Sequence, residues 1–126
     1  MKLKHTALVC SSEESSDRFY KTLLGLEKME PKTVPADLSK QIFNIDLELK
    51  IIHYTNPDIH FEIFISDYEK TQNNKIEHVC IEMDHLEKFL GKCRFLNVEI
   101  TQVSMPGKTL TFIRDFDGNI FEIKEK

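Results

Sequence analysis

Residues 111–123 read TFIRDFDGNIFEI, and this stretch decides how the rest of the chain is interpreted. Apolar residues recur on both sides of Asp117-Gly118, which is the pattern of two strands joined by a tight turn. On the closing strand, Phe121 and Ile123 share one face and Glu122 lies on the other, because successive side chains in a strand alternate. The hairpin therefore predicts a carboxylate on the sheet face opposite the apolar core.

Three further residues with metal-binding side chains lie in predicted strands. His5 lies in the segment LKHTALV, Glu62 in HFEIFI and His78 in KIEHVCIE. Together with Glu122 they occur in the order His, Glu, His, Glu. Imidazole and carboxylate groups are the expected ligands of a divalent first-row metal with open coordination positions. The pattern predicts that these four residues bind one metal ion.

Hydrophobic periodicity predicts the same order of elements in both halves of the chain, namely strand, helix and three strands. The first half is expected to contain strands at 3–10, 26–34, 47–55 and 59–66, a helix at 13–25 and an additional short helix at 35–43. The second half is expected to contain strands at 76–83, 97–103, 109–115 and 119–124 and a helix at 85–95. The polar residues 69–75 form a linker. We therefore predict an α+β fold with module one at about 1–66 and module two at about 75–126, within a single domain.

Capping residues mark the ends of the predicted helices. Ser12, with Ser15 and Ser16, offers side-chain oxygens to the start of the first helix, and Gly25 ends it. Asp84 is expected to cap the helix of the second half.

The strand faces that carry Glu62 and Glu122 should point away from the helices, because their apolar neighbours take the opposite faces. A sheet curved around this polar face would bring the four predicted ligands together.

Composition excludes several classes of function. A chain of 126 residues is expected to form one domain. Its net charge of −4 and the lack of a basic block argue against binding to nucleic acid or to an anionic membrane. Cys10, Cys80 and Cys93 have no C-x-x-C spacing and are expected in the core. No signal peptide and no membrane span are expected, so we predict a cytoplasmic protein.

The sequence resembles the vicinal oxygen chelate superfamily, which includes glyoxalases, bleomycin-resistance proteins and extradiol dioxygenases. The residues that carry the resemblance are the opening His5-Thr6-Ala7-Leu8-Val9, then Arg18-Phe19-Tyr20 and Leu24-Gly25-Leu26, and finally residues 112–119 with Glu122. The resemblance implies paired βαβββ modules that form an open, curved mixed sheet around a metal cavity.

Within the superfamily, the four ligands match the pattern of glyoxalase I, the lactoylglutathione lyase. The resemblance implies Ni, Co, Zn, Mn or Fe bound by His5, Glu62, His78 and Glu122, a small substrate with vicinal oxygens, and a homodimer. It also implies that Glu122 or Glu62 moves the substrate proton. Glutathione-dependent members carry an arginine on the first strand after the histidine. This chain has none there, so the resemblance does not identify the thiol cosubstrate.

Other interpretations remain at this stage. The same metal surface would serve a thiol transferase or other antibiotic-resistance enzyme, or an extradiol dioxygenase, whereas a metal-free pocket would serve a small-molecule binding protein. Glu48 and His60 compete with Glu62 for the ligand position, and His53 and His60 either line the cavity or are ordinary exposed residues. Residues 115–119 are expected to serve the geometry of the hairpin.

Overall fold

The computed structural model describes residues 1–67 and 76–126, which fall into two compact units, Met1–Lys70 (unit 1) and Thr71–Lys126 (unit 2). The predicted linker at 69–75 lies outside the described residues. Each unit contains one mixed sheet together with helix, so the predicted α+β class is confirmed. The assignment of both modules to a single domain stays a prediction. No described helix is long and apolar enough to cross a membrane.

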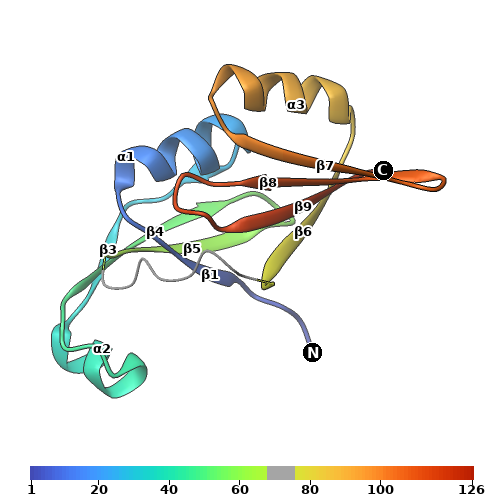
Figure 1. The fold of residues 1–126 in the computed structure, drawn as a ribbon. Helices are drawn as coiled ribbons and strands as arrows, with labels where there is room; N and C mark the ends of the chain where they lie inside the picture. Colours follow the sequence, from blue (N-terminus) through green and yellow to red (C-terminus); the bar gives the residue numbers. More distant parts are fainter. Residues whose placement is uncertain (68–75) are drawn as a thin grey trace. The chain divides into compact units, whose positions relative to one another are not determined.

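Unit 1 is built around a sheet with the strand order β1-β5-β4-β2, to which β3 is added by pairing with β4 (Figure 1). β1 and β5 are parallel, and the other pairs are antiparallel. The parallel pairing places the first strand of the unit beside the last. Its elements are β1 (Thr6–Cys10), α1 (Glu13–Ser16), the π-helical segment η1 (Asp17–Leu23), β2 (Glu27–Lys28), β3 (Lys32–Val34), α2 (Ala36–Phe43), β4 (Leu49–Thr55) and β5 (His60–Ile65).

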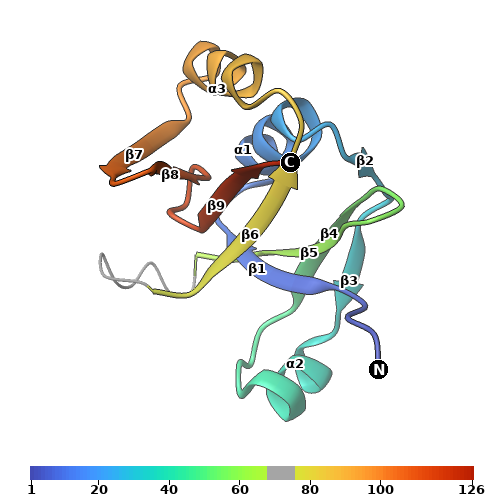
Figure 2. The same ribbon diagram turned by 90° about the vertical axis from the view of Figure 1, so that its right-hand side faces the viewer.

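The core of unit 1 lies between the α1–η1 helix and one face of this sheet. Tyr20 on η1 stacks on Tyr54 of β4 at a ring-centroid distance of 5.4 Å and meets the edge of Phe61 of β5 at 5.5 Å. All three rings are buried. In both ribbon views α2 lies away from α1 (Figures 1 and 2), and its Phe43 contacts Phe64. Phe64 shares the sheet face of Glu62, so this face lies opposite the face covered by α1–η1, and α2 contacts it through Phe43.

Unit 2 repeats this plan with the strand order β6-β9-β8-β7, in which β6 and β9 are parallel (Figure 2). α3 contacts β7 and β9 and contributes the buried Leu90 and Cys93 to the core. Its elements are β6 (His78–Met83), α3 (Leu86–Phe95), β7 (Glu99–Met105), β8 (Lys108–Arg114) and β9 (Ile120–Glu125).

Local backbone chemistry explains where strands differ from the predicted bounds. The predicted strand at 26–34 is two short strands, β2 and β3, with Pro31 between them, because proline has no N–H for a strand ladder. β7 begins at Glu99 rather than at 97, since Asn97 has a φ of 59° and cannot continue an extended strand. His5 lies one residue before β1, whose pairing with β5 starts at Thr6, so its predicted position within a strand was wrong.

The caps of the helices follow the sequence in one case and depart from it in another. The Ser12 side chain accepts a hydrogen bond from the backbone N–H of Ser15, and Gly25 follows the first helix with a φ of 71°, as predicted. Asp84 does not cap α3. The carboxylate of Glu125 on β9 instead accepts a hydrogen bond from the N–H of Leu86 at 3.0 Å.

Candidate metal centre

The first predicted ligand pair comes together in unit 1. β1 and β5 are parallel with Ala7 opposite Glu62, and His5 immediately precedes β1, two residues before Ala7. The Nε2 atom of His5 lies 3.2 Å from Oε2 of Glu62. The His5 side chain is 44% exposed and that of Glu62 is 19% exposed. The pair is therefore open to solvent on the histidine side and sheltered on the carboxylate side.

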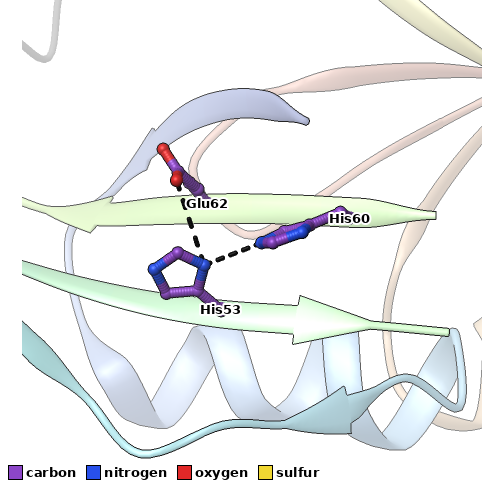
Figure 3. A group of neighbouring side chains, drawn as sticks. All are labelled: His53, His60 and Glu62. Carbon is purple, nitrogen blue, oxygen red and sulfur yellow. Dashed lines mark hydrogen bonds and ion pairs between the residues drawn. The ribbon is translucent and has the colours of Figure 1, made fainter. Parts of the chain in front are cut away.

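Two further histidines lie beside Glu62 (Figure 3). The antiparallel register of β4 and β5 sets His53 opposite Glu62, and His60 shares the face of Glu62 two residues away. Nδ1 of His53 lies 2.7 Å from Nε2 of His60 and 3.9 Å from Oε1 of Glu62. Each of the three offers one ligand atom within 4.8 Å of the others. Alternation along the strand predicted that His60 shares the face of Glu62. The position of His53 beside Glu62 depends on the register between β4 and β5, which the sequence did not reveal.

Burial controls the charge of His53. Removal from water lowers the pKa of His53 below its usual range, and the nearby Glu62 carboxylate opposes this shift. Burial has the larger effect, so the imidazole is neutral at neutral pH. A neutral imidazole is the form that binds a metal.

The second predicted pair comes together in unit 2. Nε2 of His78 lies 3.6 Å from Oε2 of Glu122. Nδ1 of the same ring lies 2.7 Å from the carbonyl oxygen of Ile76, and since a carbonyl only accepts, Nδ1 carries the proton. Nε2 is the ring nitrogen that faces Glu122. A histidine that ligates a metal is commonly oriented in this way, by donating its other N–H to a carbonyl.

Glu122 has a lysine and a cysteine as neighbours. Nζ of Lys124 lies 3.6 Å from Oε1 of Glu122. Cys80 is paired opposite Glu122 in the sheet, and partial removal of its thiol from water, together with the Glu122 carboxylate, raises the pKa of that thiol. Cys80 is exposed, so its predicted place in the core was wrong, whereas Cys10 and Cys93 are buried. The reason is parity, because Cys80 lies two residues after His78 and shares its polar face.

The donor set of each unit suits a divalent first-row metal. Each pair offers one imidazole nitrogen and one carboxylate oxygen, separated by less than 4 Å. Glu48, the rival to Glu62, precedes β4 and is exposed. His60, the other rival, lies beside Glu62 rather than replacing it. The assignment of all four residues to one ion stays a prediction.

Known proteins resemble this chain in sequence. No protein-family model matches the chain. Mitochondrial methylmalonyl-CoA epimerase from Bos taurus is 26% identical, over 98% of this chain and 74% of the relative's length. The protein of the same name from Homo sapiens is 24% identical, over 98% of this chain and 73% of its own length.

Solved structures with a similar fold include proteins of several kinds. A glyoxalase family protein from Enterococcus faecalis superposes with a TM-score of 0.73 at 21% identity, over 97% of this chain and 95% of its own. A mutant of the fosfomycin resistance protein FosX from Listeria monocytogenes, complexed with Mn(II) and a dihydroxypropylphosphonic acid, gives 0.74 at 16% identity, over 98% and 90%. Glyoxalase I from Leishmania major gives 0.76 at 18% identity, over 99% and 86%.

These likenesses show which fold the chain has. The chain has the fold of the vicinal oxygen chelate superfamily, and the resemblance drawn from its sequence is confirmed. One fold supports many reactions, so the fold by itself does not select among them.

Proposed function

We propose that this protein is a metal-dependent isomerase or lyase of glyoxalase type. Its substrate is a small molecule with neighbouring oxygens, and the reaction moves a proton on a carbon next to a carbonyl. The observation that carries the proposal is the recurrence of a His–Glu pair on the polar sheet face of each unit, His5 with Glu62 and His78 with Glu122.

The metal ligands in this proposal are His5, Glu62, His78 and Glu122, with Ni²⁺, Co²⁺, Zn²⁺, Mn²⁺ or Fe²⁺ as the ion. When bound, such an ion supplies Lewis acidity that stabilises negative charge developing on a substrate oxygen. His78 supports the fit independently, since its Nδ1–H is held by the carbonyl of Ile76 and its Nε2 is left available.

The carboxylates of Glu62 and Glu122 are the proposed proton carriers. Both side chains are sheltered, at 19% and 17% exposed, yet each keeps an imidazole within 4 Å. A carboxylate held in this way can accept a proton from substrate carbon and return it to the neighbouring atom, which contributes about 10²–10⁴-fold to turnover. Nζ of Lys124 lies 3.6 Å from Oε1 of Glu122 and adds a positive charge beside this carboxylate.

A second candidate is an epimerase that acts on an acyl thioester. The specific observation is the 26% identity to a methylmalonyl-CoA epimerase over 98% of the chain. Epimerisation next to a carbonyl removes a proton from one face of a carbon and returns it to the other face. The two candidates therefore share the proton-removal step and differ in the substrate. The absence of an arginine after His5 on β1 favours a substrate other than glutathione.

The test compares Glu122→Gln and Glu62→Gln with the wild type at measured metal occupancy, with Glu87→Gln on the exposed side of α3 as a control. The substrates are methylglyoxal with a panel of thiols and a 2-methyl-branched acyl thioester, followed by deuterium exchange at the carbon beside the carbonyl. The variant that lacks the base should lose about 10²–10⁴-fold in turnover at full occupancy.

Two outcomes separate the alternatives. Full turnover in both glutamine variants at full occupancy would exclude proton transfer by a carboxylate and would favour a thiol transferase or another resistance enzyme. A purified wild-type protein that holds no metal, and whose exchange activity does not respond to added metal, would point instead to a metal-free binding protein.

A further inference from the structure

Glu62 presents its two carboxylate oxygens to different histidines. Oε2 lies 3.2 Å from Nε2 of His5, and Oε1 lies 3.9 Å from Nδ1 of His53. His60 completes the second side, with its Nε2 atom 2.7 Å from Nδ1 of His53 (Figure 3). The proposed function uses the first side only, so His53 and His60 remain without a role in it.

The second side is built on rigid elements. His53 lies on β4 and His60 and Glu62 lie on β5, and residues 50–55 of β4 pair with the whole of β5. The side chains of His53 and Glu62 are 15% and 19% exposed, which makes both half-buried. Donor atoms held on paired strands keep their spacing better than donors on loops. This arrangement is contained within unit 1.

The spacing of the three donors is close to that of a metal site. Ligands at about 2.0–2.2 Å in tetrahedral geometry stand about 3.2–3.6 Å from one another. The two imidazole nitrogens, at 2.7 Å, must separate by less than 1 Å to reach this spacing, and the His53–Glu62 distance of 3.9 Å must shorten by less than 1 Å. Small side-chain rotations achieve both changes without moving the strands.

We propose that His53 Nδ1, His60 Nε2 and Glu62 Oε1 form a second divalent-metal site inside unit 1. Two imidazoles and one carboxylate suit Zn²⁺, Co²⁺ or Ni²⁺. This inference rests on the proposed function in one respect: Glu62 is shared, with Oε2 facing the ion beside His5 and Oε1 facing the second ion. A bridging carboxylate of this kind joins metal ions about 3.5–4 Å apart.

The experiment measures Zn²⁺ and Co²⁺ binding to the full-length protein by equilibrium dialysis with elemental analysis, and the Co²⁺ absorption spectrum. Wild type is compared with His53→Gln/His60→Gln, which removes the second site, and with His78→Ala/Glu122→Gln, which removes the pair in unit 2. His85→Asn is the matched control, because it removes an exposed imidazole and asparagine tolerates the positive φ of 58° at this position.

Wild type should bind about two equivalents of metal, and each double variant should bind about one. The His78→Ala/Glu122→Gln protein should keep the Co²⁺ spectrum of an imidazole-rich site. Equal stoichiometry in wild type and His53→Gln/His60→Gln would overturn the inference and leave the proposed function standing. A different result would overturn the proposed ligand set and support the second metal site. In that result, His53→Gln/His60→Gln loses metal, whereas His78→Ala/Glu122→Gln retains its metal and its turnover.

A measurement on wild type guards against failure of the variants to fold. Imidazole ¹⁵N resonances report which ring nitrogen binds metal. Addition of Zn²⁺ should shift Nδ1 of His53 and Nε2 of His60 and leave His85 unchanged. Unperturbed His53 and His60 resonances at saturating Zn²⁺ would show a simple hydrogen-bonded histidine pair and refute the second site.

Discussion

At the scale of single residues, Asp115 fixes the turn that places Glu122. Its Oδ1 atom accepts hydrogen bonds from the backbone N–H groups of Asp117 and Asn119, both at 2.9 Å. Its Oδ2 atom accepts one from the side-chain amide of Asn119 at 2.7 Å. Gly118 supplies the φ of 87° that the turn requires. These contacts support the predicted role of residues 115–119 in the geometry of the hairpin.

Replacement of Asp115 by alanine should lower the free energy of unfolding by about 2–4 kcal/mol, because it leaves backbone donors without their charged acceptor in a buried turn. Urea denaturation measures the loss. Asp117→Ala is the control, since the Asp117 carboxylate is not the acceptor in these bonds, and its effect should stay within about 0.5 kcal/mol. Equal losses in both variants would contradict the assignment of the turn to Asp115.

At the scale of elements, a charged network ties the first helix of unit 1 to the sheet it covers. Nζ of Lys28 on β2 lies 2.6 Å from Oε2 of Glu13 on α1 and 2.9 Å from Oδ2 of Asp17 on η1. Lys50 on β4 also pairs with Glu13. The hydroxyl of Tyr54 on β4 donates to Asp17 at 2.8 Å. The helix is thereby held over the apolar face, opposite to the face that carries Glu62.

Glu13→Gln should destabilise the protein at neutral pH and have little effect in acid. Hydrogen bonds from Lys28 and then Lys50 hold the pKa of Glu13 below its ordinary value of 4.5. Between the pKa of Glu13 in the folded protein and its ordinary value, the folded protein binds fewer protons than the unfolded chain. The stability that Glu13 contributes is therefore complete above pH 4.5 and is lost as the pH falls through the lowered pKa.

The measurement is the melting temperature of wild type and variant across this pH range at low salt, because salt screens partly exposed charges. Glu14→Gln, one residue along on the same helical turn, is the matched control. A difference between wild type and Glu13→Gln that stays constant down to about pH 3 would show that the charge of Glu13 is not the cause.

At the scale of the whole molecule, each unit contains one His–Glu pair, so the predicted four-ligand centre needs both units. We predict a homodimer, in which the two pairs of one centre come either from one chain or from two copies. Isologous dimers are the commonest oligomers of soluble proteins. Variants that change one residue of one pair can distinguish a centre formed within one chain from a centre formed between two copies, because each variant leaves the pair of the other unit intact.

His5→Ala and His78→Ala should each lose metal from the predicted centre and melt at a lower temperature than wild type in the presence of metal, through the loss of binding linkage. Mixing the two variants under conditions of subunit exchange should restore roughly a quarter of wild-type activity if one centre draws on two copies of the chain. No restoration, with full exchange shown by native mass spectrometry, would assign both pairs to one chain. Unchanged metal content in a His5→Ala/His78→Ala double variant would refute the ligand set itself.

Features that depend on near neighbours in the chain followed from the amino-acid sequence alone. The alternation around Glu62 and Glu122 predicted their strand faces, and Asp117-Gly118 predicted the hairpin. Ser12 and Gly25 predicted the ends of the first helix. Each depends on the backbone preferences of a few consecutive residues, which a single sequence displays directly.

Features that depend on pairing between distant segments became visible in the folded protein. The register of β4 and β5 brings His53 to Glu62, and the parallel pairing of β6 and β9 brings Cys80 to Glu122. The fold also recruits Glu125 from the last strand to the start of α3 in place of Asp84. Strand register is set by the packing of whole faces, so no local pattern reveals which side chains meet across it.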